Sequence, residues 1–206
     1  MTRLFLTFWL AMTLLTSLSA NARTCAQLYS DWSVKWIGSG ISGTAYLHQN
    51  SVTNQSFVEK IYNMPSQREN DQKAFALLHK LTDLSGSSVK DLQILKPEWL
   101  PLEQPAQGRP IAKSRLPYAR GETLESALIK AAPEQKIKLL AQYERALSEL
   151  LGLCQSSGLC RGEIEKDAYN PAPTLKMGGM GALVLIKTDN VIYDRSTEVL
   201  TIIDPF

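Results

Sequence analysis

The sequence predicts an α+β fold in which strands and helices come in separate groups. Three strand-like segments come first, over residues 33–62, and polar or Gly-rich turns separate them. The strongest helix is expected from Pro133 to Gln155, where apolar residues recur every three or four positions. The pattern places no helix between the first strands, whereas a doubly wound parallel sheet needs one at each crossover. A Rossmann-type fold is therefore excluded.

The remaining segments complete this order of elements. A helix is expected over residues 66–81, with an apolar face that includes Phe75 and Leu78. Residues 155–181 are rich in Gly and Pro and are expected to be mostly loop. The other expected elements are strands in "LQIL", "PIAKSRL", "ALVLI", "NVIYD" and "VLTIID" and a short helix in "TLESALIKAA".

Composition excludes several classes of function. Of 206 residues, 44% are hydrophobic and 20% are charged, which is typical of a folded chain. The net charge of +2 is too small to favour binding to nucleic acid or to a membrane surface. The chain has only two histidines, His48 and His79, which is too few to favour a histidine-containing zinc site or a histidine-based catalytic triad.

The N-terminal segment resembles a secretory signal peptide. "MTR" precedes the apolar run "LFLTFWLAMTLL", and Ala20 and Ala22 fit an A-x-A cleavage site. The apolar run is short for a transmembrane anchor, which is the alternative. We therefore expect residues 1–22 to be a removable segment, with no stable membrane insertion after processing.

Three glycines, Gly38, Gly40 and Gly43, have the spacing G-x-G-x-x-G, with Ser39 between the first two. Such a turn lets backbone amides approach phosphate oxygens, because no side chain is in the way. The spacing also occurs in dinucleotide-binding turns and in plain hairpins. A Walker loop is excluded, because Thr44 follows where that loop has Lys and a hydroxyl residue.

Lys60 follows on the third expected strand, where its ammonium group could reach the phosphates of a nucleotide bound under the turn. A partner acid is expected on the helix that comes next. Asp71 has the better helical phase relative to Phe75 and Leu78, whereas Glu69 has the longer reach. We expect Glu69 to be the partner, with Asp71 as the alternative.

A glycine-rich hairpin followed by a strand lysine resembles the protein kinase superfamily, and two later segments are similar to it as well. "RLPYARGETLESAL" resembles the hinge between kinase lobes, which implies that the backbone near Leu116 and Tyr118 faces adenine. "TDNVIYDRSTEVLTIIDPF" resembles the end of a catalytic loop followed by the metal-binding aspartate. The resemblance implies ATP and magnesium as cofactors, with Asn190 and Asp204 as metal ligands.

The resemblance also implies a two-lobed protein-kinase-like fold, with an N-lobe over residues 30–116 and a minimal C-lobe over 117–206. The sequence departs from the family where H-R-D is usual, because Leu183 to Leu185 occupy those positions. Asp189 is then the expected catalytic carboxylate, and Glu163 is the alternative. Pro205 gives D-P-F instead of D-F-G, and the sequence ends two residues after Asp204, which implies a truncated C-terminal lobe.

A kinase fold of this size resembles the Hop-type effector kinases of type III secretion, which phosphorylate the ninety-kilodalton heat-shock chaperone of the host. That implies a secreted virulence effector: a monomeric serine/threonine protein kinase that acts on a host protein, with this chaperone as the candidate substrate, and binds no nucleic acid. A signal peptide would instead deliver the chain to the periplasm. The alternatives are a catalytically dead kinase-fold binding module, which the missing H-R-D favours, and a small-molecule phosphotransferase.

The cysteines carry little functional information. Cys25, Cys154 and Cys160 do not have metal-ligand spacing. Cys154 and Cys160 could pair in an oxidising compartment, but we expect ordinary packing in a helix and a loop.

Overall fold

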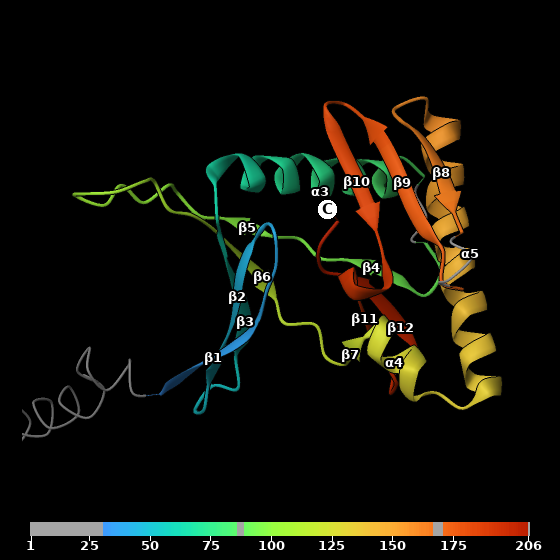
Figure 1. Ribbon diagram of the computed structural model, residues 1–206, viewed down its shortest axis with the longest axis horizontal. Coiled ribbons are helices and arrows are strands. Elements are labelled where there is room, and N and C mark those ends of the chain that lie inside the picture. The colour runs from blue at the N-terminus through green and yellow to red at the C-terminus, as the bar shows by residue number, and fades with distance from the viewer. Residues whose placement is uncertain (1–30, 86–88, 167–170, 206) are drawn as a thin grey trace, which may run out of the picture.

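The computed structural model describes residues 31–85, 89–166 and 171–205 and shows a mixed α+β fold (Figure 1). The signal-like residues 1–22 and Cys25 lie outside these ranges. The described residues form three α-helices, and none of the three is long and apolar enough to cross a membrane. The helices are α3 (Pro65–Ser85), α4 (Leu124–Lys130) and α5 (Pro133–Ser157), and a 3₁₀ turn η1 spans Thr188–Asn190.

An antiparallel five-stranded sheet contains the first strands of the chain in the order β1-β2-β3-β6-β5. The first three strands and β6 confirm the predicted segments, whereas the short β5 was not predicted. This sheet lies to the left in Figure 1. Its strands are β1 (Trp32–Ser39), β2 (Gly43–Asn50), β3 (Ser56–Tyr62), β5 (Glu98–Trp99) and β6 (Ala112–Pro117).

Two smaller sheets form the other part of the molecule. One has the order β10-β9-β8, and the other has the order β4-β12-β11-β7 with β4 and β12 parallel. Strands β10, β11 and β12 confirm the three predicted C-terminal strands. The strands are β4 (Leu92–Ile94), β7 (Glu122–Thr123), β8 (Arg161–Glu165), β9 (Thr174–Gly179), β10 (Ala182–Ile186), β11 (Val191–Asp194) and β12 (Val199–Ile202).

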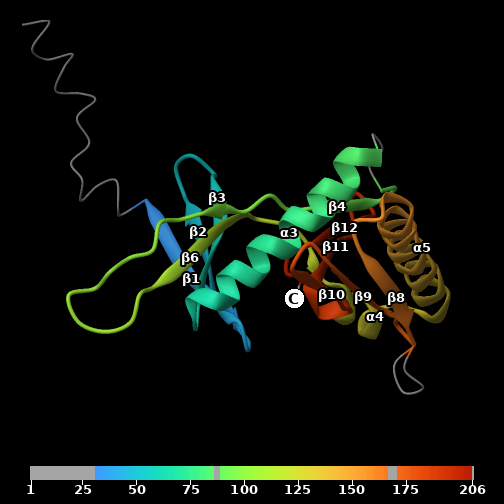
Figure 2. The same cartoon turned by 90° about the horizontal axis from the view of Figure 1, so that it is seen from above.

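Helix α3 connects the two parts, because it packs against β3 and β6 at one end and against β10 along the rest (Figures 1 and 2). It begins with Pro65, whose missing amide hydrogen costs nothing in the first turn of a helix. Leu77, Leu78 and Leu81 recur at helical spacing and are almost fully buried. The apolar stripe predicted from the sequence therefore turns α3 toward the core.

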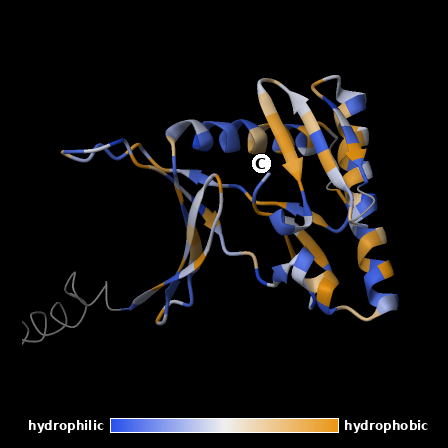
Figure 3. Ribbon diagram, viewed as in Figure 1, coloured by the Kyte–Doolittle hydropathy of each residue, from blue (hydrophilic) through white to orange (hydrophobic). Residues whose placement is uncertain are grey.

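The main hydrophobic core lies between α3, α4, α5 and the two smaller sheets (Figure 3). Helix α5 contributes one stripe to it, which includes Tyr143, Leu147 and Leu150. The helix ends at Gly158, whose φ of 67° is left-handed and suits glycine. This core supports the strands that carry the C-terminal site residues.

The expectation of a loop over residues 155–181 is wrong, because β8 and β9 pair there in an antiparallel hairpin. Strand β9 buries alternate side chains, Leu175 and Met177, and β8 alternates exposed with half-buried positions. The Gly and Pro residues of this segment favoured the prediction of a loop over that of two short strands. Cys154 and Cys160 form a disulfide between the end of α5 and β8, so ordinary packing was also the wrong expectation for this pair.

Candidate functional site

A cavity of about 380 Å³ lies between the five-stranded sheet and the β11–β12 hairpin. The glycine-rich turn, Lys60 and the segment that leaves β6 line it on the sheet side. Asp189, Asn190 and Asp204 line it on the hairpin side. The structure thus brings together nearly all of the residues predicted for the site, from segments far apart in the sequence.

The glycines of the turn between β1 and β2 serve different purposes. A side chain at Gly43 would place Cβ 2.2 Å from the carbonyl oxygen of Ile61, so only glycine lets β2 approach β3 this closely. A Cβ at Gly38 or Gly40 would meet nothing within 4 Å. These two glycines and Ser39 line the cavity, so the open space beside their backbone is available to a ligand.

Lys60 stands at the charged end of the cavity. Its Nζ donates to Asp71 Oδ2 at 2.8 Å and to Asp204 Oδ2 at 2.7 Å. Burial by itself would lower the pKa of Lys60, but the carboxylates of Asp204 and Asp71 outweigh it and raise the pKa above its ordinary value. The lysine is therefore held as a cation between the α3 helix and the segment after β12.

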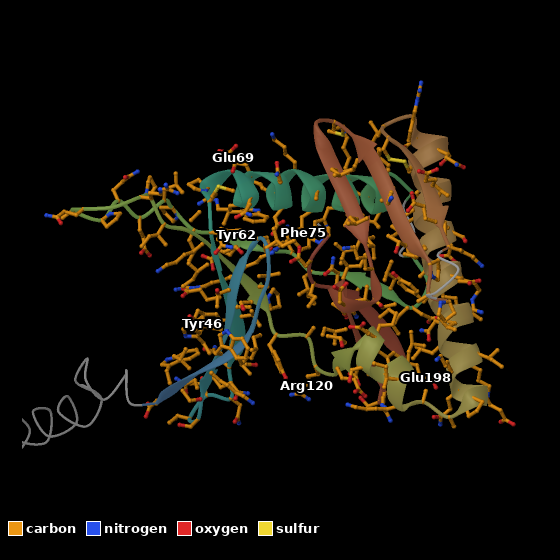
Figure 4. All side chains as sticks on the ribbon, viewed as in Figure 1. Tyr46, Tyr62, Glu69, Phe75, Arg120 and Glu198 are labelled. Carbon is orange, nitrogen blue, oxygen red and sulfur yellow. A yellow bond between two sulfur atoms is a disulfide. The ribbon has the colours of Figure 1, made fainter. Side chains whose placement is uncertain are left out.

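Asp71, and not Glu69, is the partner of Lys60 on α3, so the expectation for Glu69 is wrong. Glu69 is exposed, and Figure 4 shows it on the side of the helix away from Tyr62. Asp71 is buried on the same stripe as Phe75, which makes helical phase more decisive than reach. A glutamate on the outer face cannot reach inward however long its side chain is.

Two residues that sequence reasoning missed complete the environment of Asp71. The hydroxyl of Tyr62 donates to Asp71 Oδ2 at 2.9 Å and lies 3.1 Å from Ser114 Oγ. Burial, followed by the charge of Asp71, raises the pKa of Tyr62. Spacing in the sequence could have identified Tyr62, because it is two positions after Lys60 in a strand and hence on the same face of the sheet.

The β11–β12 hairpin brings Asp204 and Asn190 to the lining of the same cavity. Val191 pairs with Ile202, so Asn190 lies opposite Ile203, one position before Asp204. The amide of Ile203 donates to the carbonyl of Asn190 at 3.0 Å. Beyond Asp204, Pro205 accepts a hydrogen bond from the Leu185 amide at 2.7 Å. Backbone bonds thus hold Asp204 on both sides.

Asp189 lies in η1 and is exposed toward the cavity that it lines with Asn190 and Asp204. Glu163 lies on β8, where it pairs with Lys176, and it does not line this cavity. The positions where H-R-D was expected, Leu183 to Leu185, belong to strand β10. Of the two predicted carboxylates, only Asp189 is therefore at the site.

Most of the remaining lining is apolar. Ala45, Val58 and Leu116 line it from the sheet, while Ile192 and Ile203 line it from the hairpin. Tyr118 and its neighbours from the segment after β6 also line the cavity. The cavity thus combines apolar side chains from both sides with the charged group of Lys60 and Asp204, which is common in sites for small molecules.

The oxygen donors at the charged end suit a hard cation that also binds phosphate. Asp189 and Asn190, just before β11, and Asp204, just after β12, offer carboxylate and amide oxygens to the same cavity. Among the described residues no group of three or more His, Cys, Asp or Glu could hold a metal alone. Magnesium in phosphate sites commonly uses only one or two carboxylates and takes its other ligands from phosphate and water. The residues present therefore fit magnesium that arrives with a nucleotide.

No protein-family model matches the sequence, and no curated protein matches it either. A proposed function must therefore rest on the geometry of the cavity.

Proposed function

We propose that the chain is an ATP-dependent serine/threonine protein kinase with a two-lobed kinase-like fold. The observation that carries the proposal is the contact of Lys60 with both Asp71 and Asp204 at one end of a cavity that a glycine-rich turn covers. A lysine between a helix acid and a metal-binding aspartate is the arrangement that positions phosphates in protein kinases. The lobes would meet just after β6, near residue 117.

In this proposal the adenine ring binds among the apolar side chains of the cavity, beside Leu116 and Tyr118. The phosphates then extend toward Lys60 beneath the turn formed by Gly38, Ser39 and Gly40. Backbone amides of such a turn and a nearby ammonium group both stabilise phosphate oxygens. A cavity lined by both apolar and charged residues suits a nucleotide better than it suits a uniformly polar ligand.

Asn190 and Asp204 would hold the magnesium ion, which neutralises charge on the phosphate oxygens when it is bound. Lys60 would then exchange its bond to Asp204 for a phosphate oxygen while it keeps its bond to Asp71. Because Asp71 is buried, it holds Lys60 in the same place before and after nucleotide binding. Phosphoryl transfer depends mainly on this kind of positioning and charge stabilisation.

Asp189 would orient the acceptor hydroxyl and accept its proton. It is the carboxylate next to Asn190 that lines the cavity without belonging to the Lys60 contacts. Its exposed side chain leaves access for a hydroxyl group from a protein substrate. The resemblance to Hop-type effectors supports a host protein as substrate, with the ninety-kilodalton chaperone as the candidate, and a secreted monomer as the active form.

The experiment is transfer of the γ-phosphate of labelled ATP to proteins of a host lysate and to the purified chaperone. Lys60→Ala and Asp204→Ala should each lower transfer by orders of magnitude, because each removes charge that faces the phosphates. Asp189→Asn should abolish transfer with little change in ATP affinity. Glu163→Gln is the matched carboxylate control and should remain active.

Three results would contradict the proposed kinase activity, and a fourth would contradict only the role of Asp189. Absence of ATP binding would exclude the nucleotide site. ATP binding without transfer to any protein would favour an inactive binding module, and transfer to small molecules alone would favour a small-molecule phosphotransferase. Activity in Asp189→Asn combined with loss of activity in Glu163→Gln would exclude Asp189 as the base.

A further inference from the structure

Two side-chain amides outside the cavity hold the tip of the glycine-rich turn. Asn63 Nδ2 and Gln67 Nε2 each donate to the carbonyl oxygen of Ile41 at 2.9 Å. The backbone amide of Asn63 also donates to the carbonyl of Ser42 at 3.1 Å. The turn is thereby attached to the connection between β3 and α3 and to the first turn of the helix.

The donors are themselves fixed. Gln67 lies in the first turn of α3, and its Oε1 accepts from the Met64 amide at 3.0 Å. This bond satisfies a free amide at the start of the helix, as the glutamine of a capping box does. It also directs Nε2 of the same side chain toward Ile41. Both lone pairs of the Ile41 carbonyl are used, one by each side chain.

Packing contributes little to the position of this tip. Ile41 is 92% exposed, and the positions beside Gly38 and Gly40 are open. The hydrogen bonds from Asn63 and Gln67 are therefore the main tertiary restraint on the tip among the described residues.

The direction of these bonds determines which groups the turn offers to the cavity. In a trans peptide the N–H points opposite to the C=O, so a carbonyl of Ile41 that faces α3 turns the Ser42 amide away from α3. Ser42 lines the cavity, whereas Asn63 and Gln67 do not. The bonds to the Ile41 carbonyl thus favour the conformation in which the Ser42 amide points toward the cavity, while the Gly40 amide donates within the turn to the Gly43 carbonyl at 2.8 Å.

We propose that Asn63 and Gln67 are positioning residues that hold the glycine-rich turn in its phosphate-binding conformation. This inference rests on the proposed kinase function. Gln67 and Asp71 are four positions apart and share a face of α3, so one helix face positions both the turn and Lys60. The two groups that would contact the phosphates from the sheet side are in this way coupled through the first turns of α3.

The sharpest variant is Gln67→Glu, because the glutamate keeps an oxygen for the Met64 amide but loses the donor to Ile41. A carboxylate in the first turn of a helix is favourable, so the helix cap should persist. Asn63→Ala with Gln67→Ala removes both side-chain bonds. The matched controls are Gln72→Glu and Asn70→Ala, which are exposed on the same helix and make no side-chain hydrogen bond among the described residues.

Calorimetry with magnesium ATP and with adenosine should separate an effect on phosphate binding from an effect on binding of the nucleoside. Loss of two hydrogen bonds should weaken ATP binding by about tenfold in the double variant. Gln67→Glu should also weaken ATP binding, while adenosine affinity stays unchanged because adenosine has no phosphates. Amide hydrogen exchange over residues 38–43 should become faster in both variants without nucleotide, and the two controls should behave as wild type.

Equal losses for ATP and adenosine would indicate a general structural role and overturn the inference. Wild-type ATP affinity in the double variant would also overturn the inference, but it would leave the proposed kinase function unaffected. A wild-type protein that binds no ATP would overturn both. In each case thermal unfolding identifies a variant that fails to fold.

Discussion

Replacing Asp71 by asparagine tests whether this residue is the carboxylate that holds Lys60. The change keeps the shape of the side chain and removes its charge. The matched control is Glu69→Gln, which removes the same charge from the exposed face of the same helix.

The expected magnitude follows from the contacts. Two charges 2.8 Å apart, the Lys60–Asp71 distance, attract by about 6 kcal/mol in a medium of effective dielectric constant 20. Asp204 remains as a partner for Lys60, and the amide oxygen of the introduced asparagine still accepts a hydrogen bond from Lys60. Much of the attraction is therefore retained. Asp71 Oδ1 is buried without a hydrogen-bond partner, and an amide nitrogen placed there would have no acceptor.

We therefore expect Asp71→Asn to lower the free energy of unfolding by about 3 kcal/mol, at the lower end for a broken buried ion pair. For a chain of this size the midpoint of thermal unfolding should fall by about 6–12 °C. Glu69→Gln should change stability by less than about 0.5 kcal/mol. Urea unfolding followed by circular dichroism measures both. Equal stability of the two variants, or a larger loss in Glu69→Gln, would refute the assignment of Asp71.

Three further predictions follow from single residues. Gly43→Ala should lower stability by about 1–3 kcal/mol in urea unfolding, because its Cβ would meet the backbone of β3, while Gly38→Ala should be neutral; similar losses would contradict the close-approach argument. Thr123→Ala should cost about 1 kcal/mol in the same assay, because its hydroxyl caps α4 by accepting from the Ser126 amide, and an unchanged midpoint would exclude that role. Burial, followed by the charge of Asp189, raises the pKa of Tyr143, so stability should fall above about pH 10, where only the unfolded tyrosine ionises. Tyr143→Phe should reduce that fall in an alkaline unfolding series, and an unchanged slope would contradict it.

Local sequence pattern was sufficient for most of the fold. Alternation and turn residues identified β1, β2 and β3, and helical periodicity identified α3 and α5, because these signals depend on neighbours a few positions away. The order of the glycine-rich turn, Lys60 and Asp204 was likewise evident. Strands β8 and β9 were missed, because a few alternating residues beside glycines and prolines resemble a loop until the partner strand is known.

Tertiary structure decided which side chains meet. Asp71 and Glu69 are both acids near the start of one helix; helical phase favoured Asp71, but only the packing of α3 beside β3 brings its carboxylate to 2.8 Å from Lys60 Nζ. The contact of Gln67 with Ile41 spans 26 positions and involves a backbone carbonyl, which a one-dimensional pattern does not reveal. Spacing along the chain determines secondary structure, whereas the packing of one element on another determines the distances on which the chemistry of the site depends.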